Sequence, residues 1–211
     1  MAKKHKLTRG GASTRDHIIA SAKVVLHDVG FAHFSTPKVS AQAGISQGNL
    51  TYYFPNRNQL ILAVVESLVT EYSDAFTRFY SQFERVSQKD LEKMVEWLID
   101  DATTEKTARV IPELWAMSNH NADVALAMHR LYDDTACTFA ESLGVSIDNP
   151  LYDDFMSAIY FLSATVEGAT AIHVTRPADH DKRLQLLKRS AVPVLANLLF
   201  GIIEAAQRKH S

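Results

Sequence analysis

The chain has 211 residues, of which 46% are apolar and 22% charged, a composition that suits one or two compact domains. Its single cysteine, Cys137, excludes a disulfide framework and a cysteine-rich zinc site. No uninterrupted apolar run approaches the ~18–20 residues that cross a bilayer, and the basic first residues lack the apolar stretch of a secretory signal. We therefore expect a soluble, cytoplasmic protein without a membrane partner.

The net charge of −2 conceals a division along the chain. Residues 1–57 carry eight lysines and arginines against two aspartates, a net charge of +6, whereas residues 58–211 carry a net charge of −8. A basic N-terminal part suits a polyanion such as nucleic acid, although uneven surface charge also arises by chance. Residues 1–12 are expected to form a disordered basic arm, which either reaches phosphates or only adds solubility.

Apolar residues recur at intervals of three and four along nearly the whole chain, which predicts an all-α fold. Hydroxyl side chains at Thr36 and Ser46 are suitable N-caps, and Gly30 and Gly44 are suitable helix stops. Together these signals predict three N-terminal helices, over residues 13–29, 36–43 and 46–54.

A long fourth helix is expected from about residue 56 to residue 84, and at ~1.5 Å per residue it would span about 40 Å. The later helices are expected to begin near Ser87, Thr104, Asn121, Pro150 and Asp181. Pro112 should break or kink the helix that begins at Thr104, and Pro193 should interrupt the last helix.

Residues 36–54 predict two short helices joined by a tight turn. Gly44 lies where the chain reverses, and glycine adopts positive φ there without steric cost. The residues spaced to pack beneath the turn are Val39, Ala43, Ile45, Leu50 and Tyr53. This is the helix-turn-helix arrangement, whose second helix enters the major groove of DNA. Acidic residues are absent from 37–58, as contact with phosphates requires; the alternative is an ordinary corner between two helices.

The stretch TPKVSAQAGISQGNLTYYFPNRNQL, residues 36–60, resembles the DNA-binding signature of the tetracycline-repressor (TetR) family, and the resemblance covers about residues 14–65. It implies an N-terminal three-helix helix-turn-helix domain over residues 13–57. A long helix would then join this domain to a helical effector-binding and dimerisation domain over residues 58–211.

The resemblance also implies roles for single residues. Thr36 matches a helix-start hydroxyl that contacts phosphate, and Arg57 stands where a lysine near a phosphate is usual. Thr51 stands where a tyrosine is common, so the neighbouring Tyr52 is its expected substitute. The matching residues at the start of the recognition helix and at its end are Ser46, Gln47, Gly48, Asn49, Tyr53 and Phe54.

We expect Gln47, Asn49 and Tyr52 to read base edges, because amide side chains pair bidentately with adenine. Backbone positioning is assigned to Thr36, Ser46, Tyr53 and Arg57. The whole predicted DNA-binding set is Thr36, Lys38, Ser46, Gln47, Gly48, Asn49, Thr51, Tyr52, Tyr53 and Arg57.

Two apolar C-terminal segments, residues 150–175 and 181–209, are candidates for a homodimer interface; a monomer would have to bury them internally. A small, largely hydrophobic or aromatic effector is expected to bind between these segments and residues 90–145. The large or polar residues proposed for this effector pocket are Trp97, Trp115, Asn119, His120, Met128, Tyr132, Phe139, Phe161, Glu167 and His173. Each of them has an alternative as an ordinary core or surface residue.

The hypothesis is therefore a ligand-responsive transcriptional regulator, a repressor that binds a palindromic operator in double-stranded DNA as a homodimer. No phosphate-binding loop, zinc-protease motif or serine-hydrolase motif is present, and the nine histidines are scattered. We accordingly expect no enzyme activity, no cofactor and no metal. The alternative is a helical adaptor that binds only protein, which would explain the C-terminal segments but not the basic, acid-free corner.

Overall fold

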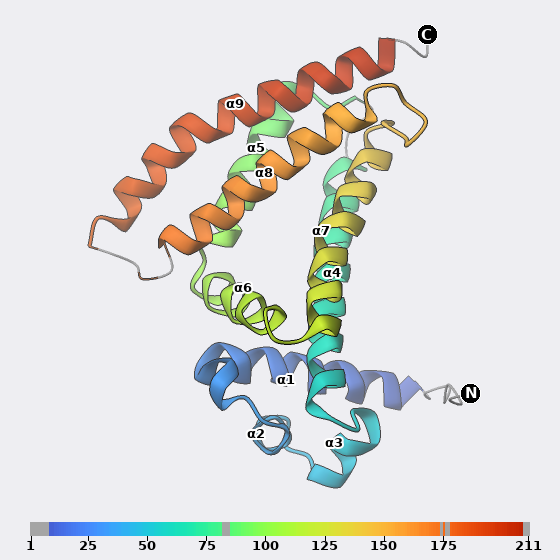
Figure 1. Ribbon diagram of the computed structural model, residues 1–211, viewed down its shortest axis with the longest axis vertical. Helices are drawn as coiled ribbons and strands as arrows, with labels where there is room; N and C mark the ends of the chain where they lie inside the picture. Colours follow the sequence, from blue (N-terminus) through green and yellow to red (C-terminus); the bar gives the residue numbers. More distant parts are fainter. Residues whose placement is uncertain (1–8, 82–84, 174, 176–177, 209–211) are drawn as a thin grey trace. The chain divides into compact units, whose positions relative to one another are not determined.

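The structure, a computed structural model, describes residues 9–81, 85–173, 175 and 178–208 (Figure 1). Within these ranges the chain forms nine α-helices and no strand, so the prediction of an all-α fold is confirmed. The helices are α1 (Arg9–His33), α2 (Thr36–Gln42), α3 (Gln47–Tyr53), α4 (Arg57–Tyr80), α5 (Gln88–Ala102), α6 (Glu105–Ser118), α7 (Ala122–Ser142), α8 (Tyr152–His173) and α9 (His180–Arg208).

Contacts divide the chain into two compact units. The first unit comprises Met1–Leu68 with Glu113–Met128, and the second comprises Val69–Pro112 with His129–Ser211. Helices α4, α6 and α7 therefore each begin in one unit and end in the other. This division differs from the boundary expected at residue 57, because the first turns of α4 pack within the first unit. The Asn58 amide, for example, donates a hydrogen bond of 3.1 Å to Asp123 of α7.

The glycines end the early helices as the sequence predicts. Gly30 interrupts α1 with φ of +67°, and Gly44 follows α2 with φ of +65°. Two boundaries differ from expectation. The helix α1 begins at Arg9, so residues 9–12 are helical rather than part of an arm, while residues 1–8 lie outside the described part of the chain. The N-cap of α2 is Ser35, because its backbone is extended whereas Thr36 is already helical.

The two prolines lie inside continuous helices, so the expected breaks do not occur. Pro112 is within α6 and Pro193 is within α9. A proline removes one backbone hydrogen bond, and packing of the helix on both sides of it offsets that loss. In α9 the packed residues that follow the proline include Leu195 and Leu199, both buried.

The core of the second unit lies where α5, α8 and α9 pack on one another. Figure 1 shows α8 and α9 running side by side. Leu91, Met94 and Ile99 lie on the buried stripe of α5, and Ser87 begins this helix with a capping box to Asp90. The Lys188 ammonium of α9 bonds to Asp100 of α5, which satisfies a cation that is nearly buried.

Helices α8 and α9 are also long and apolar enough to cross a membrane, judged by length and composition alone. Their mean hydropathies over 18 residues are 1.3 and 1.6, and a third of each window is buried within the fold. Polar residues interrupt the apolar runs in both segments, as the sequence shows. Core helices of globular folds have the same property, and both helices contribute to the core of the second unit.

Candidate nucleic-acid interface and ligand cavity

The turn between α2 and α3 is fixed by contacts to the first helix. His17 Nε2 of α1 lies 3.0 Å from the carbonyl oxygen of Ala43, the residue before the turn glycine. Val39 and Leu50 are fully buried beneath the turn, whereas Ile45 and Tyr53 are half-buried. The predicted packing triangle is therefore present, and the inner face of α3 packs beneath the turn.

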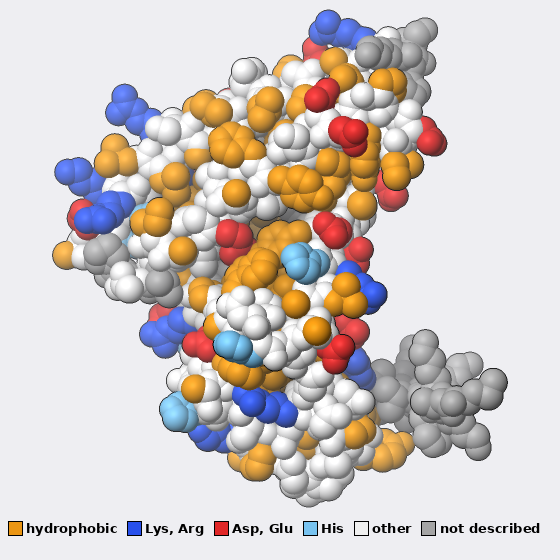
Figure 2. All heavy atoms as spheres, in the orientation of Figure 1, with side chains coloured by type: hydrophobic (Ala, Val, Ile, Leu, Met, Phe, Trp, Pro, Cys, Tyr) orange, Lys and Arg blue, Asp and Glu red, His pale blue; other side chains and the backbone are white. Residues whose placement is uncertain are grey.

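The outer face of α3 is open. Gln47, Gly48, Asn49 and Thr51 are exposed, and Tyr52 exposes 65% of its surface. In the view of Figure 2, the part of the surface over α2 and α3 shows no acidic side chain. An exposed helix face with hydrogen-bonding groups and without acids is what a DNA groove admits.

Ser46 positions this helix as its N-cap. Its hydroxyl accepts the backbone N–H of Asn49 at 3.1 Å, the bond that the sequence predicts. Thr36 is half-buried at the start of α2 and Lys38 is exposed one turn on. These polar groups lie on the two helices that the turn brings together.

The two amide side chains of α3 are in different situations. Gln47 donates from Nε2 to Thr36 Oγ1 and accepts from Ser40 Oγ, both at 3.0 Å, so its amide ties α3 to α2. Within the described part of the chain, no hydrogen bond engages the Asn49 amide. Of the predicted base-reading residues, Asn49 and Tyr52 therefore have exposed side chains, whereas the side-chain amide of Gln47 is bonded to Thr36 and Ser40.

Arg57 lies differently from a residue that reaches for phosphate. Its guanidinium donates to the carbonyl oxygen of Phe31 at 2.7 Å and stacks over the Phe31 ring, 4.0 Å from the ring centre. Burial lowers the pKa of Arg57, and its Nε is buried without a hydrogen-bond partner among the residues that the structure describes. In this structure Arg57 thus holds the end of α1, because a planar guanidinium can stack and donate at once.

A second contact holds the same segment. Glu113 of α6 accepts the backbone N–H of Phe31 at 2.7 Å. Its carboxylate also fills the space beside Gly30, where a β-carbon would lie 3.0 Å from the Glu113 oxygen. Glycine suits position 30 for two reasons: it adopts positive φ without strain, and it has no side chain to clash with the Glu113 carboxylate. No sequence signal pointed to Glu113, since its partner is a backbone group 82 residues away.

This geometry is that of a helix-turn-helix protein with an exposed second helix. Residues 18–64 match the family model for bacterial regulatory proteins of the tetR family, so this part of the chain is identified as a DNA-binding domain of that family.

Relatives and solved structures agree with this assignment. The chain is 25% identical over 112 residues to the HTH-type transcriptional regulator BetI of Stenotrophomonas maltophilia, covering 53% of this chain and 57% of the relative. It is 34% identical over 91 residues to the HTH-type transcriptional regulator CymR of Pseudomonas putida, covering 42% and 45%. The chain thus spans about half the length of these curated relatives.

The fold likeness extends further than the sequence likeness. A putative TetR-family transcriptional regulator from Mesorhizobium loti superposes with a TM-score of 0.68 at 15% identity, covering 96% of this chain and 98% of the other. A TetR transcription regulator from Haloarcula marismortui gives a TM-score of 0.67 at 12% identity, covering 88% and 97%. Identities this low establish the fold alone.

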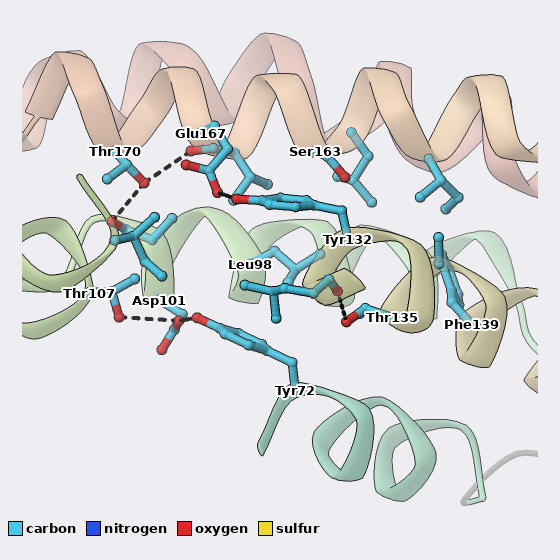
Figure 3. A pocket seen from close by; sticks show the side chains of 17 residues that line it. Tyr72, Leu98, Asp101, Thr107, Tyr132, Thr135, Phe139, Ser163, Glu167 and Thr170 are labelled. Atoms are coloured by element: carbon cyan, nitrogen blue, oxygen red, sulfur yellow. Dashed lines mark hydrogen bonds between the residues drawn. The ribbon is translucent and has the colours of Figure 1, made fainter. Parts of the chain in front are cut away.

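The second unit contains a cavity of about 110 Å³. Apolar side chains form most of its wall, and the rest of the wall includes two carboxylates and two phenols (Figure 3). The polar lining residues are Tyr72, Asp101, Thr107, Tyr132, Thr135, Ser163, Glu167 and Thr170. These residues come from α4, α5, α6, α7 and α8, so no short stretch of sequence encodes the cavity.

Two tyrosine–carboxylate pairs face the cavity. The Tyr72 hydroxyl donates to Asp101 Oδ2 at 2.6 Å, and the Tyr132 hydroxyl donates to Glu167 Oε1. Burial, and then the charges of Asp101 and Glu167, raise the pKa of Tyr72 well above its usual value. The Tyr72 phenol therefore acts as a protonated donor to Asp101.

Most residues proposed for the pocket lie elsewhere. Tyr132, Phe139 and Glu167 line the cavity. Trp97 and Phe161 are partly exposed, by 39% and 51%, and the His173 ring is buried against His180 instead. The remaining predicted residues, Trp115, Asn119, His120 and Met128, belong to the first unit. The residues that line the cavity and those that do not are alike in size and polarity. Only the tertiary packing decides which of them surround the cavity.

Proposed function

We propose that the protein is a cytoplasmic transcriptional repressor that binds a palindromic DNA operator as a homodimer and is released by a small-molecule effector. The observation that carries the proposal is the exposed, acid-free outer face of α3, capped by Ser46 and held by its buried inner face. Asn49 and Tyr52 contact base edges, while Thr36, Lys38, Ser46 and Tyr53 contact the DNA backbone.

The dimer is proposed to form through α8 and α9. Large apolar side chains remain exposed on both helices, and a soluble monomer rarely leaves so many on adjoining elements. They are Tyr160, Phe161, Ile172, Leu186, Val194 and Leu198. Pairing of these two helices with a second copy gives a four-helix interface. Two recognition helices one turn of DNA apart, ~34 Å, would then read an inverted repeat.

The cavity of the second unit is the proposed effector site. Thr107 and Ile111 of α6 line it, and Glu113, on the same helix, bonds to Phe31 next to the kink in α1. An effector that binds one position of α6 more tightly than another therefore changes the support of the DNA-binding helices. Equal affinity for both positions would change nothing.

Gel shifts with the full chain test DNA binding directly. The probes are the DNA upstream of the adjacent genes, searched for an inverted repeat, and random duplex DNA over a range of salt concentrations. We expect salt-dependent binding to both, tighter to the repeat. A helical adaptor that binds only protein would give no shift at any salt concentration, and that result would refute the proposal.

Substitution of Asn49 tests the assigned face. Asn49→Ala should relax the preference for the repeat by ~1–3 kcal/mol, with unchanged salt dependence, because a base contact is lost and phosphate contacts remain. Asn119→Ala is the matched control, because Asn119 is an exposed amide outside α3. Equal losses of binding to both probes in Asn49→Ala would contradict the assignment.

A further inference from the structure

The cavity has an unbalanced set of polar groups. Among the described residues that line it, two are carboxylates, Asp101 and Glu167, and none is lysine, arginine or histidine. An anionic ligand would meet two negative charges without a cation to offset them. A ligand of the opposite charge would meet two acceptors that are partly withdrawn from water.

The hydroxyl groups do not compensate for the missing cations. Tyr72 and Thr107 both donate toward Asp101, at 2.6 and 3.4 Å, and Tyr132 donates to Glu167. Thr135 donates to the backbone carbonyl oxygen of Leu131 in its own helix, and Thr170 donates to that of Ala102 in α5. Five of the six hydroxyls in the described lining are therefore committed to protein acceptors, and Ser163 is the remaining donor. The described lining thus offers two carboxylate acceptors and one uncommitted hydroxyl donor.

From these observations we propose that the effector of the proposed regulator is a small organic ammonium ion. Its nitrogen faces the carboxylates of Asp101 and Glu167, and its apolar part lies against Phe139 and the aliphatic wall. This inference rests on the proposed function in that the cavity is taken as the effector site. Beyond the proposed function, the inference specifies the charge and the size of the ligand.

Size and wall chemistry support the same ligand. The cavity of about 110 Å³ is comparable with the ~150 Å³ apolar cavity that holds benzene in an engineered protein, so a compact ligand fits. The aliphatic wall includes Leu98, Ile159 and Leu162. The rings of Tyr72, Tyr132 and Phe139 add faces that attract a cation. A compact ammonium ion with an apolar substituent matches both parts of this lining.

Electrostatics favours the occupied state. The negative charges of Asp101 and Glu167 both act on the Tyr72 hydroxyl, because both raise its pKa. Two like charges that share a partly buried space repel each other, and a cation between them offsets that repulsion. Binding of an ammonium ion is therefore favourable for a reason that a neutral or acidic ligand lacks.

The test uses the full-length chain and matched ligands. Benzylammonium, benzyl alcohol and benzoate carry a cation, a neutral group and an anion on nearly the same apolar body, and isobutylammonium, isobutanol and isobutyrate form a smaller set. Calorimetric titration and thermal shift measure their binding. We expect the ammonium member of a set to bind best and the carboxylate not to bind. Equal binding within each set, a preference for the carboxylate, or no binding of either ammonium ion would overturn the inference.

Two variants locate the binding site. Glu167→Gln and Asp101→Asn keep the side-chain shapes and remove one charge each. Each should weaken ammonium binding by roughly tenfold to a hundredfold, as loss of a hydrogen bond to a charged group does, and leave binding of the alcohol within about twofold. Glu141→Gln is the matched control, because Glu141 is exposed on α7 and does not line the cavity. Unchanged ammonium affinity in both cavity variants would place the ion elsewhere.

DNA binding distinguishes the two levels of the proposal. If gel shifts succeed but the ammonium ions do not bind, the ligand class is wrong and the regulator assignment stands. If the ammonium ions bind in the cavity but no DNA shift is found, the proposed function fails while the ligand chemistry is upheld. Release of the operator by an ammonium ion that binds the cavity would support both.

Discussion

The exposed face of helix α3 and the cavity differ in how the chain encodes them. The face of α3 consists of residues within a single stretch of seven, Gln47–Tyr53, so its chemistry can be followed directly in the sequence. The cavity is assembled by five helices whose lining residues range from Tyr72 to Thr170. A site on one helix is a local property, whereas a cavity is a property of the packing between helices.

The two sites also differ in charge. Acidic residues are absent around α3, and the cavity instead contains two carboxylates without a basic residue in its described lining. The region around α3 therefore favours a polyanion as its partner, whereas the cavity favours a cation. The difference shows that the negative charge of the second part of the chain is not only a solvated surface, because some of it is directed inward.

The largest expected effect comes from the inner face of α3. Leu50→Ala should lower the free energy of unfolding by about 2–5 kcal/mol, since Leu50 is fully buried and its truncation leaves a cavity. Chemical denaturation measures this loss. DNA binding should fall with it, because α3 is then no longer held on α1 and α2.

Thr51→Ala is the control on the neighbouring position. Thr51 is exposed and bonds only to the backbone of its own helix, so stability should change by no more than about 0.5 kcal/mol. If both variants destabilised the protein equally, the division of α3 into a buried and a presented face would be wrong.

Arg57 gives the next largest effect and separates a structural role from a DNA contact. Arg57→Ala should lower the free energy of unfolding by about 1.5–3 kcal/mol, the range for a hydrogen bond to a charged group. It removes both the bond to the Phe31 carbonyl and the stacking on the ring. The salt dependence of DNA binding should stay near that of the wild type. A salt slope reduced by about one, with stability unchanged, would instead assign Arg57 to a phosphate.

The fold and the exposed face of α3 follow closely from the sequence because their signals are local. Positive φ at Gly44, the Ser46 cap and the alternation of buried and exposed residues in α3 each depend on neighbours within a few positions. The interruption expected at Pro193 was wrong for the opposite reason. Whether Pro193 breaks a helix depends on the packing of Leu195 and Leu199 on other helices, which the local sequence does not contain.

The residues that line the cavity are harder still to predict from the local sequence. His173 and Tyr132 are both large polar residues on apolar helices, and both were candidates for the pocket. The structure places Tyr132 in the cavity and turns His173 toward the start of α9. Asp101 was not a candidate, since a carboxylate at the end of α5 looks like a solvated residue until Tyr72 and Thr107 are brought to it.

His173 predicts a pH dependence in the second unit. Burial, and then the charges of His180 and Arg183, lower the pKa of His173, while Asp179 opposes them. The unfolded chain therefore takes up the proton first as the pH falls below about 6.5. Stability contributed by neutral His173 is complete above this pH and is lost below it, by at most about 1.4 kcal/mol per pH unit.

Denaturation measured between pH 5 and 8 checks this dependence. His173→Phe should flatten the loss of stability at acidic pH, because phenylalanine keeps the ring against His180 and cannot be protonated. The exposed His129 supplies the control: His129→Phe should retain the slope of the wild type. An identical slope in the His173 variant would assign the pH dependence to other groups.

The smallest expected effect concerns α6, the helix whose residues 105–112 belong to the cavity unit and whose residues 113–118 belong to the DNA-binding unit. Glu113→Gln keeps an oxygen acceptor for the Phe31 N–H but removes its charge, and should cost about 1 kcal/mol of stability, since a charge-assisted hydrogen bond is roughly twice as strong as a neutral one. Glu105→Gln on the same helix loses only an exposed pair with Arg109 and should cost about 0.5 kcal/mol or less.

Effector response decides whether the Glu113 contact also joins the two sites. In Glu113→Gln, an ammonium ion should bind the cavity with unchanged affinity but release DNA less completely than in the wild type. The reason is that a weaker hydrogen bond then connects Phe31 of α1 to α6. Reciprocity requires that DNA then weakens ammonium binding less as well. Titration of the ammonium ion with and without operator DNA measures both quantities. Full release in Glu113→Gln would leave the contact a support for α1 alone and would direct the search for coupling to α4 and α7.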